Sequence, residues 1–528
     1  MSMFKSVAAV GSLTFVSRIF GYIRDVLIGS IFGDSGISDV FFQAFRLPNI
    51  FRSLFAEGAL NSAFVPIFSR IHHQEGSKSA LDFARDVFTF LAILLTILIV
   101  IFEVFMPTVI GVLAPGFKSN PEKFQMAIEF GHIVFPYILF ISLSALCAGI
   151  LNSLNQFAAA TAAPILLNLF CIFALMFFAA HQDTAGYALS WGCMFAGIAQ
   201  LAWVMIACRR INMPLKLRKI EFTPQLKTLL KKMGPGIASS GVYQINLVVS
   251  TMIASYVPLA VSYLAWADRI NQFPLSIIGI AIGTVLLPLL TRQLASGKHE
   301  RASHVQNRVL QFSFSLTLPA AIAFYTISLP IVITLFQHGH FTAAMSKEVA
   351  CVLSIYSLCL PSNVMVKIFA TSFFSRGNTE TPMKVALISI GTNLVFTLIL
   401  FQFFSYYGIA WAAVISSWTN SLSLGFLLHK KGFFTPDQGL RKKLPRIVLA
   451  AFMMGGFLHF ITSYVVPYLG RSILVDFLLL VALMITGFSI YLFLVVMFKG
   501  FVYQEFKKEL KDSSDEQLID ELIKVELK

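Results

Sequence analysis

The sequence predicts an all-α polytopic membrane protein with about fourteen transmembrane helices, arranged as two parallel six-helix lobes around a central cavity plus two C-terminal helices. Of the 528 residues, 57% are hydrophobic and only 12% are charged, whereas soluble proteins carry about 25% charged residues. The mean hydropathy is +0.77. Apolar runs of bilayer-spanning length lie near 5–32, 38–68, 87–113, 126–150, 157–180, 185–207, 234–257, 261–290, 309–336, 346–374, 382–404, 408–428, 446–467 and 473–497.

The formal net charge of +14 is explained by the loops between the apolar runs. Basic residues concentrate in the loops that follow even-numbered runs, at 208–232, 291–308 and 429–443. By the positive-inside rule, these loops and both termini are predicted to be cytoplasmic. The charge therefore indicates membrane orientation, and binding to nucleic acid is not expected.

Two polar segments outside the runs are predicted to contain helices. Leu226, Leu229, Leu230 and Met233 recur at helical spacing among lysines. We therefore expect 208–233 to be a cytoplasmic amphipathic linker whose helix lies on the inner membrane surface. The charged and amphipathic tail at 501–528 is expected to be a short cytoplasmic helix.

The first half of the chain resembles the second half. AFVPIFSR at 63–70 returns as VLLPLLTR at 285–292, and MPTVIGVLAPGF at 106–117 resembles LPIVITLFQHGHF at 329–341. Because each copy holds an even number of runs, the copies have the same orientation and are expected to flank the substrate site. The predicted domains are an N-terminal six-helix lobe (1–207), the linker (208–233), a C-terminal six-helix lobe (234–430), two extra helices (431–500) and the tail (501–528).

The sequence carries no pattern typical of an enzyme, a metal site or a cofactor site. The six cysteines form no CxxC or Cys/His set, and we expect them to be small core residues. No GxxxxGK[ST] or HExxH motif is present. These observations predict a transporter that is not an enzyme and needs no cofactor.

Charged residues inside the apolar runs are the candidate functional residues. Arg18 and Arg24 lie in the first run, Arg52 in the second, Arg269 in the eighth and Lys367 in the tenth. An arginine at the centre of a spanning helix costs about 2.5–3.5 kcal/mol on insertion, and clustered guanidinium groups match the geometry of phosphate. We therefore expect these side chains to face a wet cavity and to hold an anion.

Internal ion pairs are the structural alternative for these charges. Either Arg18 or Arg24 would pair with Asp25, which lies seven positions after Arg18 and so on the same helix face. Arg46 would pair with Asp39, and Arg269 with Asp268. Pairing leaves a cationic excess of two, which matches a dianionic diphosphate: the basic residues are Arg18, Arg24, Arg46, Arg52, Arg269 and Lys367, and the acidic residues are Asp25, Asp39, Glu57 and Asp268.

Six motifs carry a resemblance to a known family. They are SRIFGYIRD (17–25), FRLPNIFRSLFAEGALNSAFVPIFSR (45–70), APGF (114–117), FPYILFISLSALCAGILN (135–152), ADRINQFP (267–274) and LPLLTR (287–292). Together they resemble the MurJ (MviN) family of lipid II flippases, within the superfamily of multidrug and polysaccharide exporters. The resemblance implies that the substrate is lipid II, the undecaprenyl-diphosphate-linked disaccharide-pentapeptide precursor of peptidoglycan. The protein would move it from the inner to the outer leaflet of the bacterial cytoplasmic membrane by alternating access.

The resemblance also assigns site residues. Family arginines that match Arg24, Arg52 and Arg269 are implied to contact the diphosphate, and the one that matches Arg18 is also required. The two extra helices are implied to form a groove for the lipid tail. Some members bind sodium through acidic residues in the seventh and eleventh runs, which have none here, so no metal site is expected. The predicted substrate-binding set is Arg18, Arg24, Arg52, Arg269, Asp25, Asp39 and Lys367.

Two other functions stay open at this point. A related exporter of drugs or of other lipid-linked sugars would share the fold, although a cation-coupled drug exporter is expected to centre on acidic residues. A non-transporting scaffold for cell-wall enzymes would not need the buried arginines. The expected partners are lipid II, membrane lipids, and proteins of cell-wall synthesis and division. A membrane potential, negative inside, acts at about 2.3 kcal/mol per charge per 100 mV and could reset the empty, basic cavity.

Overall fold

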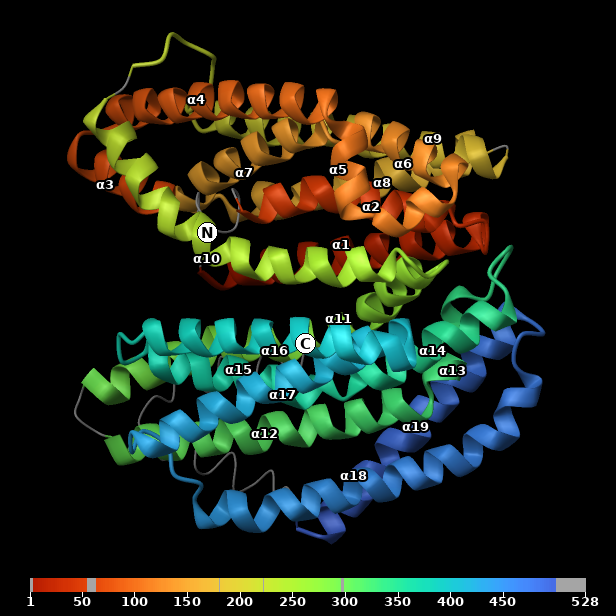
Figure 1. Cartoon of the computed structure of the whole chain (residues 1–528). Coiled ribbons are helices and arrows are strands. Elements are labelled where there is room, and N and C mark those ends of the chain that lie inside the picture. Colours follow the sequence, from red (N-terminus) through yellow and green to blue (C-terminus); the bar gives the residue numbers. More distant parts are fainter. Residues whose placement is uncertain (1–2, 55–62, 180, 222, 296–298, 500–528) are drawn as a thin grey trace. The chain divides into compact units, whose positions relative to one another are not determined.

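The computed structural model describes residues 3–54, 63–179, 181–221, 223–295 and 299–499, which form helices and loops with no strand among them (Figure 1). The all-α prediction is confirmed. The predicted tail at 501–528 and Glu57 lie outside the described residues. The helices are α1 (Met3–Phe32), α2 (Ile37–Arg52), α3 (Val65–Gln74), α4 (Ser77–Val104), α5 (Met106–Leu113), η2 (Pro115–Ser119), α6 (Pro121–Val134), α7 (Tyr137–Ser153), α8 (Phe157–Phe178), α9 (Gln182–Arg210), α10 (Pro224–Ala254), α11 (Ala260–Ala295), α12 (His299–Thr326), α13 (Ser328–Phe336), α14 (Ala343–Ser357), α15 (Cys359–Phe374), α16 (Glu380–Phe404), α17 (Tyr406–Lys430), α18 (Gln438–Val465), η3 (Val466–Tyr468) and α19 (Ile473–Met497).

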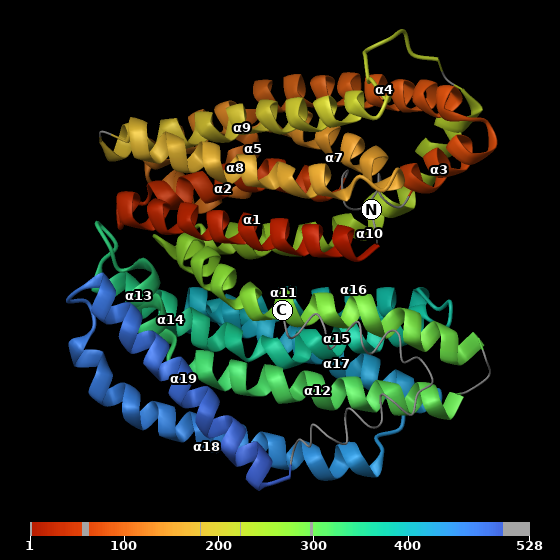
Figure 2. The same ribbon diagram turned by 180° about the vertical axis from the view of Figure 1, so that it is seen from behind.

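The described residues form two compact units. The first contains the chain up to Trp266 together with Phe336–Ser346 and Phe401–Ile409, and the second contains the remainder. In the first unit, α8 packs against α1 and α9, which run alongside it in Figure 2. In the second unit, α12 packs against α15 and α18, and α18 packs against α19. The division into lobes at 207 and 430 stays a prediction.

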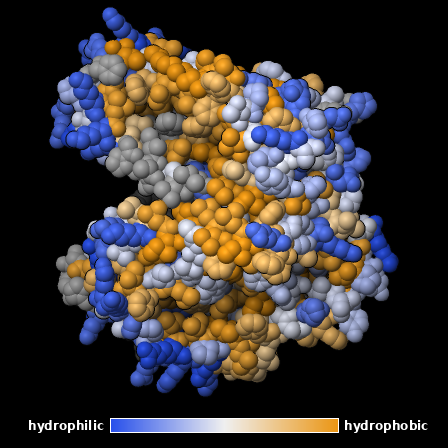
Figure 3. All heavy atoms as spheres, in the orientation of Figure 1, coloured by the Kyte–Doolittle hydropathy of each residue, from blue (hydrophilic) through white to orange (hydrophobic). Residues whose placement is uncertain are grey.

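Nine segments of the described chain are long and apolar enough to cross a membrane. Large apolar side chains on them are exposed, such as Phe177, Phe403 and Phe493, as expected for surfaces in contact with lipid. Figure 3 shows apolar side chains across the middle of one face, with hydrophilic side chains towards its left and right margins. The chain is therefore a multi-pass membrane protein, and the count of fourteen spans stays a prediction. The nine segments are Ser77–Val104, Pro121–Ser153, Phe157–Phe178, Thr184–Arg210, Glu300–Thr326, Ala343–Phe374, Glu380–Phe404, Gln438–Tyr468 and Ile473–Met497.

Some predicted runs are broken near prolines. The run at 87–113 consists of α4 and α5, which meet at Phe105, two residues before Pro107. The run at 346–374 consists of α14 and α15, which meet at Leu358, shortly before Pro361. Proline has no N–H to donate to the preceding turn and is favoured in the first turn of a new helix. Apolar length alone does not reveal such breaks.

The helix pattern recurs at a fixed spacing. Helices α4 and α12 each have 28 residues, and they begin 222 positions apart, at Ser77 and His299. Helices α7 and α15 also begin 222 positions apart, at Tyr137 and Cys359. Helices α4 and α12 are each followed at once by a short helix, α5 and α13 respectively. This spacing agrees with the internal repeat expected from the sequence.

The linker differs from its prediction. Helix α10 begins at Pro224 and continues without interruption to Ala254, so the apolar positions expected on a separate surface helix belong to the first turns of this long helix. Leu226, Leu229 and Met233 are buried against protein. The hydroxyl of Thr223 accepts from the N–H of Leu226 and caps the helix, which is why α10 begins here.

The cysteines occupy mainly core positions, as expected. Cys351 is exposed, whereas the others are buried, and all six are free thiols. The closest pair, Cys171 and Cys193, has its sulfur atoms 3.4 Å apart between α8 and α9. The buried cysteines are Cys147, Cys171, Cys193, Cys208 and Cys359.

Candidate functional site

Arg24 lies in the apolar interior of the first unit, on α1, with 8% of its surface exposed. Its Nε and Nη2 donate to Oδ1 of Asp25, at 3.0 and 2.7 Å, and Asp25 is 2% exposed. Two N–H groups on one carboxylate oxygen form a charge-assisted contact of defined geometry. Because an uncompensated buried charge is strongly unfavourable, this pair allows α1 to keep an arginine here. The predicted pairing of Arg24 with Asp25 is confirmed.

Asn168 is a second partner of Arg24 that the sequence reasoning missed. Its Oδ1 accepts from Arg24 Nη1 at 3.1 Å, and its Nδ2 donates to the carbonyl oxygen of Ser17 at 3.0 Å. Asn168 belongs to α8, so one amide joins α8 to both the guanidinium and the backbone of α1. The signal was present, because Asn168 is the single amide in the otherwise apolar run from Phe157 to Phe178.

Arg18 lies on the same helix but in a different environment. It is exposed, whereas Asp25 is buried, although their spacing predicts one shared helix face. Two residues on the same face of a helix can differ in burial, because the neighbours that pack against α1 change along its 30 residues. The structure thus offers one desolvated guanidinium, that of Arg24, and one accessible guanidinium, that of Arg18, on α1.

Asp39 is fully buried near the start of α2. Its Oδ2 accepts from Lys123 Nζ at 2.9 Å and from the backbone N–H of Leu259 at 2.8 Å. Its Oδ1 accepts from the backbone N–H of Ser262 at 2.9 Å and from the Ser262 hydroxyl at 2.7 Å. The predicted pairing of Asp39 with Arg46 is therefore wrong. The basic partner of Asp39 is Lys123, which lies in the first turn of α6.

Arg46 and Arg52 lie on the second half of α2. Arg46 Nη1 donates to the carbonyl oxygen of Leu247 on α10, at 3.2 Å. Arg52 is the last residue of α2, is half-buried, and donates from Nε to Asn49 Oδ1 at 3.3 Å. Pro48 lies inside this helix and removes one backbone N–H from its ladder.

The remaining predicted site residues lie in the second unit. Arg269 and Asp268 are exposed on α11, and Lys367 is exposed on α15. Their grouping with the arginines of the first unit stays a prediction. No cluster of three or more His, Cys, Asp or Glu side chains suitable for a metal ion occurs among the described residues.

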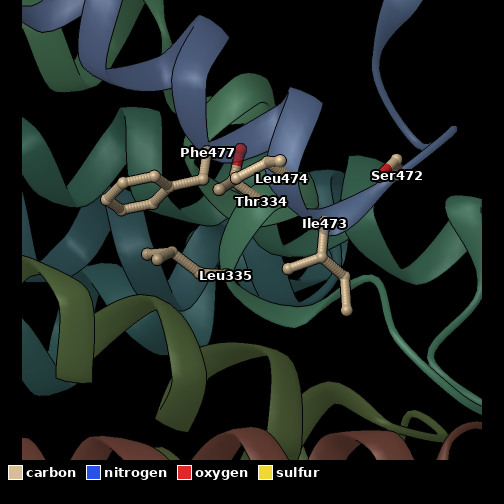
Figure 4. A pocket seen from close by; sticks show the side chains of 6 residues that line it. All are labelled: Thr334, Leu335, Ser472, Ile473, Leu474 and Phe477. Carbon is tan, nitrogen blue, oxygen red and sulfur yellow. The ribbon is translucent and has the colours of Figure 1, made fainter.

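The second unit also contains a pocket of about 530 Å³ between α13 and α19. Figure 4 shows Ile473, Leu474 and Phe477 of α19 beside Thr334 and Leu335 of α13. The lining is mostly apolar, with hydroxyls from Thr334 and Ser472. The Thr334 hydroxyl donates to the carbonyl oxygen of Asp476, at 3.2 Å. Such a surface suits hydrocarbon and offers little to a charged head group.

Comparison with known proteins places these features in a family. The family described as "Lipid II flippase MurJ" matches residues 28–482. A protein of Rhizobium meliloti (strain 1021), named "Probable lipid II flippase MurJ", is 42% identical over 464 residues, which cover 87% of this chain and 86% of that protein. The "Lipid II flippase MurJ" of Burkholderia cenocepacia is 32% identical over 518 residues, which cover 97% of this chain and all of that protein.

Solved structures support the same fold. "Lipid II flippase MurJ, inward closed conformation" aligns with a TM-score of 0.78 and 24% identity, over 93% of this chain and 98% of that one. An inward-facing multidrug resistance MATE family transporter of the MOP superfamily aligns with a TM-score of 0.64 and 17% identity, over 82% of this chain and 99% of that one. Since the family match spans most of the sequence and the relatives exceed 30% identity over most of their length, the chain belongs to the lipid II flippase MurJ family.

Proposed function

We propose that this protein moves lipid II from the inner to the outer leaflet of the bacterial cytoplasmic membrane. Relatives that match most of its length are named lipid II flippases. The structural observation that carries the proposal is the buried Arg24, held by Asp25 and Asn168 among apolar helices. Ionised residues within spanning segments are costly and generally serve an ion or substrate pathway.

The contacts of Arg24 support exchange of one anion for another. One oxygen of Asp25, Oδ1, accepts two N–H groups of the guanidinium. Two oxygens of a phosphate can accept the same two N–H groups in bidentate geometry. We propose that the diphosphate of lipid II replaces the Asp25 carboxylate as the partner of Arg24. The Asn168 amide would keep the guanidinium oriented throughout, so that the charge is presented in a fixed direction.

The other predicted residues have separate proposed roles. The more accessible Arg18 and Arg52, together with Arg269 and Lys367 of the second unit, would receive the head group in a central cavity. Asp39 has four hydrogen bonds from protein groups. We therefore propose that Asp39 holds α2 to the start of α11 and does not contact the substrate.

The pocket between α13 and α19 is proposed to receive part of the lipid tail. Its apolar lining matches a hydrocarbon chain, and α19 falls in the segment 431–500, which the sequence predicts to lie outside the repeat. The head group would then cross the membrane as the protein changes from its inward-open to its outward-open state, while the tail remains in an apolar environment. The basic loops support cytoplasmic termini, and a membrane potential would help to reset the empty cavity.

The test measures the leaflet in which lipid II resides. In cells depleted of their own flippase, wild-type protein should restore access of an external probe to labelled lipid II, and Arg24→Ala should not. Arg24→Lys keeps the charge but loses the bidentate geometry, so we expect at least about tenfold slower appearance of the lipid outside. Full rescue by Arg24→Ala would reject the proposed site. Rescue of growth without any movement of lipid II would favour the scaffold, and export of another lipid-linked sugar or a drug would favour the related exporters.

A further inference from the structure

Arg218 ties the chain that leaves α9 to the beginning of α4. Its Nη1 lies 3.0 Å from Asp82 Oδ1, and its Nε and Nη2 each lie 2.6 Å from an oxygen of Asp86. Asp86 is 1% exposed, so its carboxylate is shielded from solvent in this bidentate pair. Hydrogen bonding to Asp86 raises the pKa of Arg218. Nearby, Arg85 donates to the carbonyl oxygen of Pro214 from Nε and Nη2, at 3.2 and 3.1 Å.

The second unit contains a similar group of contacts with reversed charge. Arg308 of α12 lies 2.9 Å from Asp437, in the chain that leaves α17, and His304 lies 3.6 Å from the same carboxylate oxygen. Asn307 Nδ2 donates to the carbonyl oxygen of Thr435 at 2.9 Å. Asp437 also accepts from the N–H of Leu440 at 2.6 Å and so caps α18.

The two groups occupy equivalent places in the repeat. Asp82, Arg85 and Asp86 lie 222 positions before His304, Asn307 and Arg308, which is also the spacing between the starts of α4 and α12. Their partners correspond as well: Pro214 lies 221 positions before Thr435, and Arg218 lies 219 positions before Asp437. In each half, one side chain of the helix (Arg85 or Asn307) donates to a backbone carbonyl of the chain that leaves α9 or α17. Two other side chains of the same helix lie against one charged side chain of that segment, Arg218 or Asp437.

The reversed polarity makes each set selective for its own segment. In the first unit, two acidic residues on the helix hold a basic residue of the departing chain. In the second unit, Arg308 on the helix holds an acidic one, and His304 lies 3.6 Å from it. A segment docked on the wrong helix would place Asp437 against Asp82 and Asp86, or Arg218 against Arg308. Such like-charge contacts are strongly unfavourable when desolvated. The polarity therefore distinguishes two segments that the repeat would otherwise make interchangeable.

We propose that these residues form two equivalent clamps, one in each repeat. The first holds α4 and the end of α9 as one body during transport, and the second does the same for α12 and the end of α17. The proposal rests on the proposed function, since it treats the clamp residues as positioning residues for lipid movement. In the first unit, the clamp fixes the chain as far as Arg218, so the unclamped connection to α10 is limited to the few residues before Pro224. In the second unit, the clamp fixes the entry to α18.

The decisive experiment transplants one clamp into the other repeat. Arg218→Asp should break the first clamp, and hydrogen exchange of the backbone amides at 213 and 215–219 in detergent should become about tenfold faster. The triple change Asp82→His, Asp86→Arg and Arg218→Asp copies the charges of the second clamp, so it should return exchange to within about twofold of wild type. Lys219→Asp is the matched control, because Lys219 is adjacent and exposed, and it should leave exchange unchanged. If Arg218→Asp does not accumulate as folded protein, Arg218→Gln and Arg308→Gln provide milder breaks of the two clamps.

Lipid II movement in reconstituted vesicles provides the second measurement. It should fall at least about fivefold in Arg218→Asp and recover in the triple variant. Unchanged exchange in Arg218→Asp, or no recovery in a folded triple variant, would overturn the clamp. Altered exchange with unaltered lipid movement would overturn its role in transport. If exchange follows the clamp but wild-type protein moves no lipid II, the clamp stands and the proposed function fails.

Discussion

The carboxylate of Asp39 accepts both the backbone N–H and the hydroxyl of Ser262, at 2.9 and 2.7 Å. Ser262 Oγ also lies 2.9 Å from Ser38 Oγ, within hydrogen-bond distance. Residues more than two hundred positions apart are thus joined by one buried acid, and Lys123 balances its charge. These hydrogen bonds consequently hold the start of α2 against the start of α11 in the first unit.

Loss of the Asp39 carboxylate should destabilise this corner. Asp39→Ala would leave Lys123 and two backbone N–H groups without their acceptor, so we expect the free energy of unfolding to fall by about 3–5 kcal/mol. Ser262→Ala removes only one hydroxyl and should cost about 1 kcal/mol. Thermal unfolding of the purified variants in one detergent gives the order of stability. Equal melting temperatures for the two variants would contradict the central place of Asp39.

Removal of the Asn168 amide should affect transport more than folding. Asn168→Leu keeps the number and branching of the side-chain heavy atoms but cannot accept from Arg24 Nη1. We expect lipid II movement to fall about tenfold, because a buried donor loses its partner and the guanidinium loses its fixed direction. The matched control is Asn393→Leu on α16, another buried amide in an apolar helix. The prediction fails if both variants move lipid II at the same rate.

A methyl group at Gly33 should not fit. Gly33 has a φ of +49°, and a Cβ there would lie 2.2 Å from the carbonyl oxygen of His340. Gly33→Ala is therefore expected to lower stability by roughly 2–4 kcal/mol, through both backbone strain and displacement of the neighbouring loop. Gly432, just past the end of α17, also has a positive φ but has no atom within 4 Å, so Gly432→Ala should cost only about 1–2 kcal/mol. If the two variants melt at comparable temperatures, the loop at 337–340 can move to accommodate the added methyl group at little cost in stability.

Filling the pocket between α13 and α19 should discriminate between lipid tails. Leu474→Trp would occupy space beside Phe477 and Thr334. We expect slower movement of lipid II with its full-length tail, whereas an analogue with a short tail should move at the wild-type rate. Ile485→Trp, on the same helix at a position that is 61% exposed, is the control for a bulky side chain. If Leu474→Trp slows both lipids equally, the pocket does not hold the lipid tail during transport.

Much of the fold was determined by the sequence through pattern alone. Apolar length predicted the membrane helices, because a spanning helix must be apolar over about 20 residues. The paired motifs predicted the repeat, which the 222-residue spacing of α4 and α12 supports. Arg24 was identifiable as a candidate because a charge in an apolar run is rare, and Asp25 was named as its partner because the two are close in sequence.

Tertiary structure decided the partners that are distant in sequence. Asn168, Lys123 and Ser262 were missed because each lies far along the chain from the charge it meets, and local periodicity contains no information about such contacts. The same holds for Arg218 with Asp86, because the sequence shows only a basic loop and an acid just before the apolar run at 87–113. Composition and spacing predict which segments enter the membrane and can pair charges that are neighbours in sequence, such as Arg24 and Asp25. A buried charge whose partner is distant in sequence, such as Asp39, is compensated only because packing brings two helices together.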